Sequence, residues 1–172
     1  TELISASQEP QTELERNAEF LSAIQPKNHL SSYPKFNVNE SWAISDFQHD
    51  HFYVLSPGAD KNYRKWPASS YAEIVQLIYK KTGWTGLICG TEKEKDIGMQ
   101  IQKICDVPLE NYTGRTNLPE LAWLLSKSKL LISNETGSAH TASAVCTETI
   151  CILGGGHFDR FAPYPEIPGQ TN

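Results

Sequence analysis

The chain has 172 residues, of which 39% are hydrophobic and 20% charged, and its formal net charge is −5. This composition is typical of a globular protein with enough residues for one domain and its core. The negative charge argues against nucleic acid as a partner, because proteins that bind DNA or RNA neutralise phosphates with Lys and Arg. No apolar run approaches the roughly 20 residues that cross a bilayer.

The first 50 residues carry the acidic excess. They hold eight Asp and Glu against three Lys and Arg, whereas residues 51–172 hold twelve of each. Thr12 is expected to cap a helix that Pro26 ends, with apolar positions at Leu14, Ala18, Phe20, Leu21 and Ile24. Residues 27–50 form an expected connector, attached to the core through Val38, Trp42, Ala43 and Ile44. We interpret residues 1–50 as a linker segment from a missing N-terminal domain.

Residues 51–172 alternate short apolar runs with amphipathic stretches. Strands are predicted at residues 52–55, 85–89, 111–113, 130–133 and 149–153. Helices are predicted from Ser69 or Ser70, around Ile97 to Ile104, over residues 118–126 and after Gly137. This order is typical of βαβ units, so the sequence predicts an α/β fold with a Rossmann-like parallel sheet and helices on both faces. We expect this domain to be truncated at its C-terminus.

The cysteines and histidines show no metal-binding spacing. Cys89, Cys105, Cys146 and Cys151 form no C-x-x-C pair, and the five histidines are scattered. The sequence therefore predicts no metal site and no cofactor. We expect all four cysteines to be reduced, in a cytoplasmic protein.

The stretch after the fourth predicted strand has the composition of an anion site. Asn134 and Glu135 end the apolar run, and Thr136, Gly137 and Ser138 stand where a helix begins. The first N–H groups of a helix have no partner inside it and lie at the positive end of its dipole, so a phosphate can bind there. His140 falls in the first helical turn. The alternative is an ordinary capped helix start with a solvated histidine.

Three charged loops are expected to meet at the carboxyl edge of the sheet. They are the basic loop from Lys61 to Lys65, the acidic loop from Glu92 to Glu94, and the loop from Glu135 to His140. Right-handed crossovers place every strand-to-helix loop of a parallel sheet on one edge, where open α/β folds bind ligands. Each loop taken singly is also compatible with an ordinary solvated loop.

Several motifs resemble glycosyltransferase family 9, the ADP-heptose:lipopolysaccharide heptosyltransferases. They are SPGADKNYRKWP, ICGTEKEKD, TGRTNLPELAWLLSKSKLLISNETGSAHTASAV and CILGGG, in that order over residues 51–165. ELERNAEFL near the start also resembles the linker of this family. The segment from Thr113 to Ala144 carries the strongest resemblance.

The resemblance implies a GT-B fold, in which two Rossmann-like domains face each other across a cleft. This chain would be the C-terminal half, which binds the nucleotide sugar, ADP-heptose or a related donor. The missing N-terminal half would hold the lipopolysaccharide core or other glycan acceptor and the catalytic base. The implied reaction is an inverting, metal-independent transfer, without turnover by this part alone. The implied location is the cytoplasm, with a peripheral position at the inner face of the bacterial inner membrane left open.

The site residues implied by the resemblance are carried over position by position. Thr136, Gly137 and His140 match the diphosphate loop of the family, with Ser138 adding a hydroxyl. Glu135 stands where the family usually has Asp. Arg64 stands where the family has a phosphate-binding Lys, and Lys65 follows it. Glu92 or Glu94 would hold the ribose hydroxyls, and Gly155, Gly156 and His157 would flank the donor.

Two other functions remain open from the sequence. One is a GT-B-type epimerase that acts on a UDP-sugar, and the other is a Rossmann-like module for protein contacts without enzymatic activity. A dinucleotide oxidoreductase is disfavoured, because no G-x-G-x-x-G follows the first predicted strand of the sheet. The donor sugar, the acceptor and the oligomeric state stay undetermined.

Overall fold

The computed structural model describes residues 12–24, 35 and 37–154. The chain divides into two compact units, one of residues 35–152 and one of residues 1–34 with 153–172. The predicted loop at Gly155, Gly156 and His157 lies outside the described residues.

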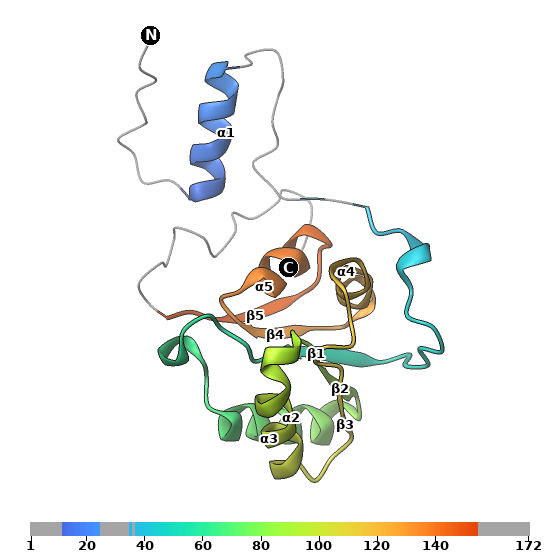
Figure 1. The fold of residues 1–172 in the computed structure, drawn as a ribbon. Coiled ribbons are helices and arrows are strands. Elements are labelled where there is room, and N and C mark those ends of the chain that lie inside the picture. The colour runs from blue at the N-terminus through green and yellow to red at the C-terminus, as the bar shows by residue number, and fades with distance from the viewer. Residues whose placement is uncertain (1–11, 25–34, 36, 155–172) are drawn as a thin grey trace. The chain divides into compact units, whose positions relative to one another are not determined.

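The larger unit is built on a parallel sheet of five strands (Figure 1). The strands are β1 (Phe52–Ser56), β2 (Thr85–Ile88), β3 (Leu109–Asn111), β4 (Leu131–Asn134) and β5 (Thr149–Ile152). Their order across the sheet is β3-β2-β1-β4-β5, and every neighbouring pair is parallel. The predicted α/β fold class is therefore confirmed.

Helices cover both faces of the sheet, as Figure 1 shows. They are α2 (Ala68–Thr82), α3 (Lys95–Ile104), α4 (Leu118–Lys127) and α5 (Gly137–Ala144), with the short 3₁₀ turns η1 (Glu40–Trp42), η2 (Asn62–Arg64) and η3 (Glu92–Glu94). Tyr71, Val75 and Ile101 from α2 and α3 pack against one face. Trp123, Leu124 and Ala142 from α4 and α5 pack against the other. Each face thus has its own apolar core.

The start of α2 differs from the prediction. The helix begins at Ala68, and Pro67 occupies the N-cap position without a side-chain hydrogen bond. Ser69 and Ser70 are therefore not caps. Proline has its φ fixed near the value that suits the start of a helix, so this helix begins two or three residues earlier than a cap at Ser69 or Ser70 would place it.

The segment before β1 is anchored to the core. Val38, Trp42 and Ile44 pack against the cluster of α4 and α5, as predicted, and Phe47 joins them. Ala43, which was predicted to be a fourth attachment point, is exposed and is not part of this contact. Glu40 accepts hydrogen bonds from Trp123 Nε1 at 3.0 Å and from Lys127 Nζ at 2.6 Å. Residues 35–50 thus belong to the same compact unit as the sheet.

The smaller unit contains helix α1 (Glu13–Ile24). Thr12 and Glu15 form a reciprocal cap, in which Thr12 N donates to the Glu15 carboxylate and Glu15 N donates to Thr12 Oγ1. The predicted capping role of Thr12 is confirmed.

All four cysteines are free. Among the described residues, no cluster of three or more His, Cys, Asp and Glu side chains could bind a metal ion. None of the helices in the described ranges has the length and apolar character to span a membrane.

Candidate functional site at the carboxyl edge of the sheet

The strand order reverses between β1 and β4. The chain runs outward from β1 through β2 to β3 and then returns to place β4 on the other side of β1. Open α/β sheets bind ligands in the crevice at such a switch point, outside the carboxyl ends of the strands. Here Ser56 at the end of β1 donates to Ser138 of α5, with the two Oγ atoms 2.9 Å apart. The predicted helix start therefore lies directly at the switch point.

Asn134, the last residue of β4, fixes the loop after β1. Its side chain is fully buried. Its Nδ2 donates to the carbonyl oxygens of Pro57 at 2.8 Å and Gly58 at 3.1 Å, and its Oδ1 accepts from Trp66 N at 3.2 Å. Sequence reasoning treated Asn134 only as a turn former. Its position at the end of a buried strand was the signal that it had to find partners inside the fold.

The start of α5 presents main-chain amides to open space. Gly137 is exposed, and a Cβ atom placed on it would meet no atom within 4 Å. The N-cap residue Thr136 makes no side-chain cap bond, and its Oγ1 lies 3.3 Å from Ser133 Oγ. The main-chain nitrogens of Gly137 and Ser138 have no hydrogen-bond partner within the described part of the chain. These two amides are therefore available to an anion.

Arg64 reaches this loop from η2. Its Nη2 donates to the main-chain oxygen of Glu135 at 3.0 Å and to Glu135 Oε2 at 3.1 Å. The Glu135 side chain is 8% exposed and that of Arg64 is 26% exposed. Lys65 is half-buried and makes no ion pair with the residues that the structure describes. The structure thus brings Arg64 and Glu135 together next to Gly137.

The two acidic residues of η3 lie further along the same edge. The Glu94 carboxylate accepts from Thr91 N and Oγ1, and a Cβ atom on Gly58 would overlap it. Glu92 pairs with Lys95 at 3.0 Å, and its side chain lies against Gly114. Glu94 therefore borders the loop after β1, whereas Glu92 borders the turn after β3. Glu94 is the nearer of the two to the switch point.

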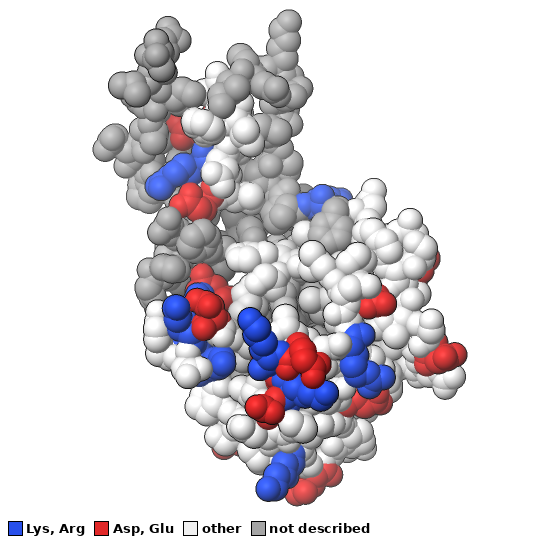
Figure 2. All heavy atoms as spheres, in the orientation of Figure 1, with Lys and Arg blue, Asp and Glu red and all other residues white. Residues whose placement is uncertain are grey.

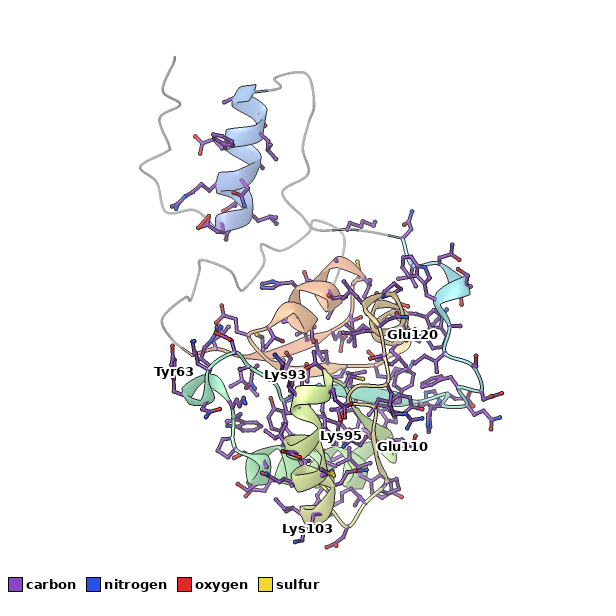
Figure 3. The ribbon with its side chains drawn as sticks, viewed as in Figure 1. Tyr63, Lys93, Lys95, Lys103, Glu110 and Glu120 are labelled. Carbon is purple, nitrogen blue, oxygen red and sulfur yellow. The ribbon has the colours of Figure 1, made fainter. Side chains whose placement is uncertain are left out.

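Other side chains at this edge are exposed to solvent. Tyr63 of η2 is 85% exposed, and Figure 3 shows it with Lys93 of η3 on the loops after β1 and β2. His140 is half-exposed in the first turn of α5. Figure 2 shows basic and acidic side chains interspersed over the face in view, without one large basic patch. Arg64 and Lys65 are the half-buried basic residues of the loop after β1.

Cys151 on β5 lies in the field of this ion pair. Burial raises the pKa of its thiol to about 11, with a further increase from Glu135 and an opposing effect of Arg64. The thiol therefore stays protonated at neutral pH and is a poor nucleophile.

A separate hollow of about 490 Å³ lies at the far end of α5. It is lined by Lys35, Asn37, Val38, Ser126, Ala144, Val145 and Cys146. None of these residues belongs to the strand-to-helix loops. The strand ends hold the ion pair of Arg64 with Glu135 and the two amides that lack a partner in the described ranges, so the candidate site lies there.

Comparison with known proteins finds a family and several relatives that this chain resembles. The family model of glycosyltransferase family 9 (heptosyltransferase) matches residues 5–168. The lipopolysaccharide core heptosyltransferase OpsX of Haemophilus influenzae is 29% identical over 116 residues, which is 66% of this chain and 33% of that protein. Lipopolysaccharide heptosyltransferase 3 of Escherichia coli is 25% identical over 120 residues, 68% of this chain and 35% of that protein.

Solved structures show the same fold. Glycosyl transferase family 9 from Veillonella parvula matches with a TM-score of 0.71 and 15% identity, over 86% of this chain and 45% of that one. ADP-heptose lps heptosyltransferase II of E. coli matches with a TM-score of 0.66 and 20% identity, over 79% of this chain and 44% of that one. The chain thus spans about a third of the length of these curated relatives. By the match along nearly its whole length, the chain belongs to glycosyltransferase family 9, the heptosyltransferase family.

Proposed function

We propose that this chain is the nucleotide-sugar-binding part of a heptosyltransferase-like enzyme, which transfers a sugar from ADP-heptose or a related donor. The observation that carries the proposal is the pair of amides at Gly137 and Ser138, which have no partner among the described residues and lie beside the guanidinium of Arg64. Family membership supports it, as do relatives named as lipopolysaccharide heptosyltransferases.

In the proposed mechanism the diphosphate of the donor lies on the N-terminus of α5. Negative charge grows on the diphosphate as the bond to the sugar breaks. Fixed N–H donors and a cation stabilise that charge more strongly in the transition state than in the ground state. Gly137 and Ser138 would supply the amides, and Arg64 or Lys65 the cation. We propose an inverting transfer that needs no metal, because these groups neutralise the leaving diphosphate.

The remaining contacts of the donor follow the edge of the sheet. Glu94 or Glu92 would accept hydrogen bonds from the ribose hydroxyls, and Glu94 is favoured because it borders the switch point. His140 would face the same site from the first turn of α5.

The acceptor and the catalytic base would belong to another domain. We propose that residues 1–50 link to such a domain and that residues 51–172 bind the donor, so that this part alone gives no turnover. The acceptor would be a lipopolysaccharide core sugar or another glycan. The enzyme would act in the cytoplasm or at the inner face of the inner membrane.

Calorimetric titration with ADP, ADP-heptose and UDP tests this function. We expect ADP and ADP-heptose to bind and UDP to bind more weakly. A preference for UDP would instead favour the epimerase. No binding of any nucleotide at millimolar concentration, to protein shown to be folded by circular dichroism, would overturn the proposal and favour an interaction module.

A further inference from the structure

The ion pair between Arg64 and Glu135 suggests separate roles for its two members. We propose that Glu135 is a positioning residue, which holds Arg64 against the loop after β4 and does not contact the sugar of the donor. This inference rests on the proposed function and refines the role of one residue in it.

The Glu135 carboxylate points toward Arg64 and is largely shielded from solvent. Its side chain is only 8% exposed, and Oε2 lies 3.1 Å from Arg64 Nη2. A carboxylate with so little exposure needs a cation or hydrogen-bond donors to offset the loss of its hydration. Arg64 is such a partner, and it reaches Glu135 from 71 residues away in the sequence. The carboxylate is thus committed to the protein in the absence of donor.

Glu135 occupies only one of the three nitrogens of the Arg64 guanidinium. Both contacts with Glu135 come from one nitrogen, Nη2. The Nε and Nη1 groups of Arg64 make no hydrogen bond to the residues that the structure describes. A guanidinium has five N–H donors in one plane, so it can hold Glu135 on one side and an anion on another.

Arg64 contacts the main chain of the loop after β4 as well as the side chain of Glu135. Arg64 also binds the main-chain oxygen of Glu135, two residues before the free amide of Gly137. The same side chain therefore fixes the backbone that presents the amides. Loss of the Glu135 carboxylate contact would loosen Arg64 and the amide loop together, and both changes weaken the grip on a diphosphate.

Glu135→Asp in the full-length protein tests the role directly. The charge is kept, but the carboxylate is shorter by one methylene and loses Nη2. We expect the affinities for ADP and ADP-heptose to fall by the same factor, about tenfold, as for the loss of one charged hydrogen bond. ADP carries no heptose, so a carboxylate that contacted the sugar would weaken ADP-heptose only. That result would overturn the inference.

Arg64→Lys and the double variant test the coupling. A lysine ammonium is a single charged centre and cannot bind Glu135 on one side and a diphosphate on another as a planar guanidinium can. We therefore expect Arg64→Lys to weaken the affinity for ADP by a similar factor. The double variant should lose less than the product of the two single losses, because both changes remove the same contact. Losses that simply multiply would contradict the proposed link, and this result does not depend on how well Glu135→Asp binds the heptose.

Glu40→Asp is the matched control. It shortens a carboxylate that pairs with Lys127 and Trp123 on α4, away from the carboxyl edge. We expect it to leave the ADP affinity unchanged. A wild-type protein that binds no ADP would overturn the proposed function. If the wild type binds ADP and Glu135→Asp binds it equally tightly, this inference is overturned and the proposed function is not.

Discussion

At the scale of single residues, the end of β4 combines buried and accessible polar groups within five positions. Asn134 is buried and holds the loop after β1, whereas Gly137 is exposed and has no side chain that must pack against neighbouring residues. Glu135 between them is paired with Arg64. Rigid neighbours thus surround the two amides proposed to bind phosphate, which is the condition for electrostatic stabilisation without reorganisation.

Gly137→Val separates a binding role from a structural one. An added Cβ atom meets open space in the free protein and Gly137 is exposed, so we expect the free energy of unfolding to change by less than about 1 kcal/mol, the range of helix propensities. A bound diphosphate would meet the added methyl groups, so the affinity for ADP should fall more than tenfold, roughly the loss of one charged hydrogen bond or more. Calorimetry and urea unfolding measure the two effects.

Ser143→Val at the other end of α5 is the control for this substitution. It puts the same side chain on the same helix, at a half-exposed position outside the strand-to-helix loop. Its ADP affinity should equal that of the wild type. An unchanged ADP affinity in Gly137→Val would show that the amide at this position does not contact the ligand.

Sequence reasoning found the loop but not the contacts within it. Turn-forming residues after an apolar run place Thr136, Gly137 and Ser138 at a helix start, because that pattern is local in the chain. The pairing of Arg64 with Glu135 spans 71 positions, and local periodicity carries no information about it. The choice between Arg64 and Lys65 as the diphosphate ligand was open for the same reason.

At the scale of elements, the loops after β1 and β4 are joined through Asn134. Three hydrogen bonds from one amide side chain connect the end of β4 to Pro57, Gly58 and Trp66. The loop that carries Arg64 is thereby held next to the start of α5. This connection explains how a loop without regular strand or helix can place a guanidinium at the switch point.

Asn134→Ala should therefore destabilise the protein strongly. The substitution leaves two buried carbonyl groups and one part-buried amide without their partner, and we expect a loss of about 3 kcal/mol in the free energy of unfolding. Asn117→Ala at the exposed capping box of α4 is the comparison, with an expected loss of about 1 kcal/mol. Urea unfolding followed by circular dichroism checks both values. A smaller loss for Asn134→Ala than for Asn117→Ala would contradict the role assigned to Asn134.

The elements themselves were predictable where their signals are local. All five strands and the helices between them were expected, because apolar runs alternate with amphipathic stretches. The bounds shifted where tertiary contacts decide: β3 is Leu109–Asn111 and not 111–113. That strand lies at the edge of the sheet, and its pairing with β2, not its composition, sets its register.

At the scale of the whole molecule, buried titratable groups predict a loss of stability in alkali. Burial raises the pKa of the Cys89 thiol to about 12, and it also raises the pKa values of Tyr53 and Tyr71. At neutral pH these groups are protonated in both the folded and the unfolded protein. Above it the unfolded chain releases protons that the folded protein retains, so the free energy of unfolding falls as pH rises.

Cys89→Ala should reduce this slope. Between about pH 9 and pH 11 the free energy of unfolding should fall less steeply than in the wild type, by up to about 1.4 kcal/mol per pH unit, the contribution of one proton. Val54→Ala, in the same core cluster, should lower the stability without changing the slope. Urea unfolding at several pH values measures both. An equal slope in Cys89→Ala and the wild type would refute the assignment.

The overall architecture follows from the sequence because the order of strands and helices admits few topologies. Right-handed crossovers bring the strand-to-helix loops to one edge, and the structure places Arg64, Glu94 and Gly137 there. Which loops are neighbours depends on the strand order, which the sequence did not provide. Within η3, the Glu94 side chain lies against Gly58 of the loop after β1, whereas the Glu92 side chain lies against Gly114 after β3.

A crystal structure of the protein with ADP would test the proposed site most directly. We predict that oxygen atoms of the diphosphate lie within hydrogen-bonding distance of the main-chain nitrogens of Gly137 and Ser138 and of the Arg64 guanidinium. ADP bound elsewhere, for example in the hollow at the far end of α5, or bound at this edge without contact to those amides, would contradict the prediction.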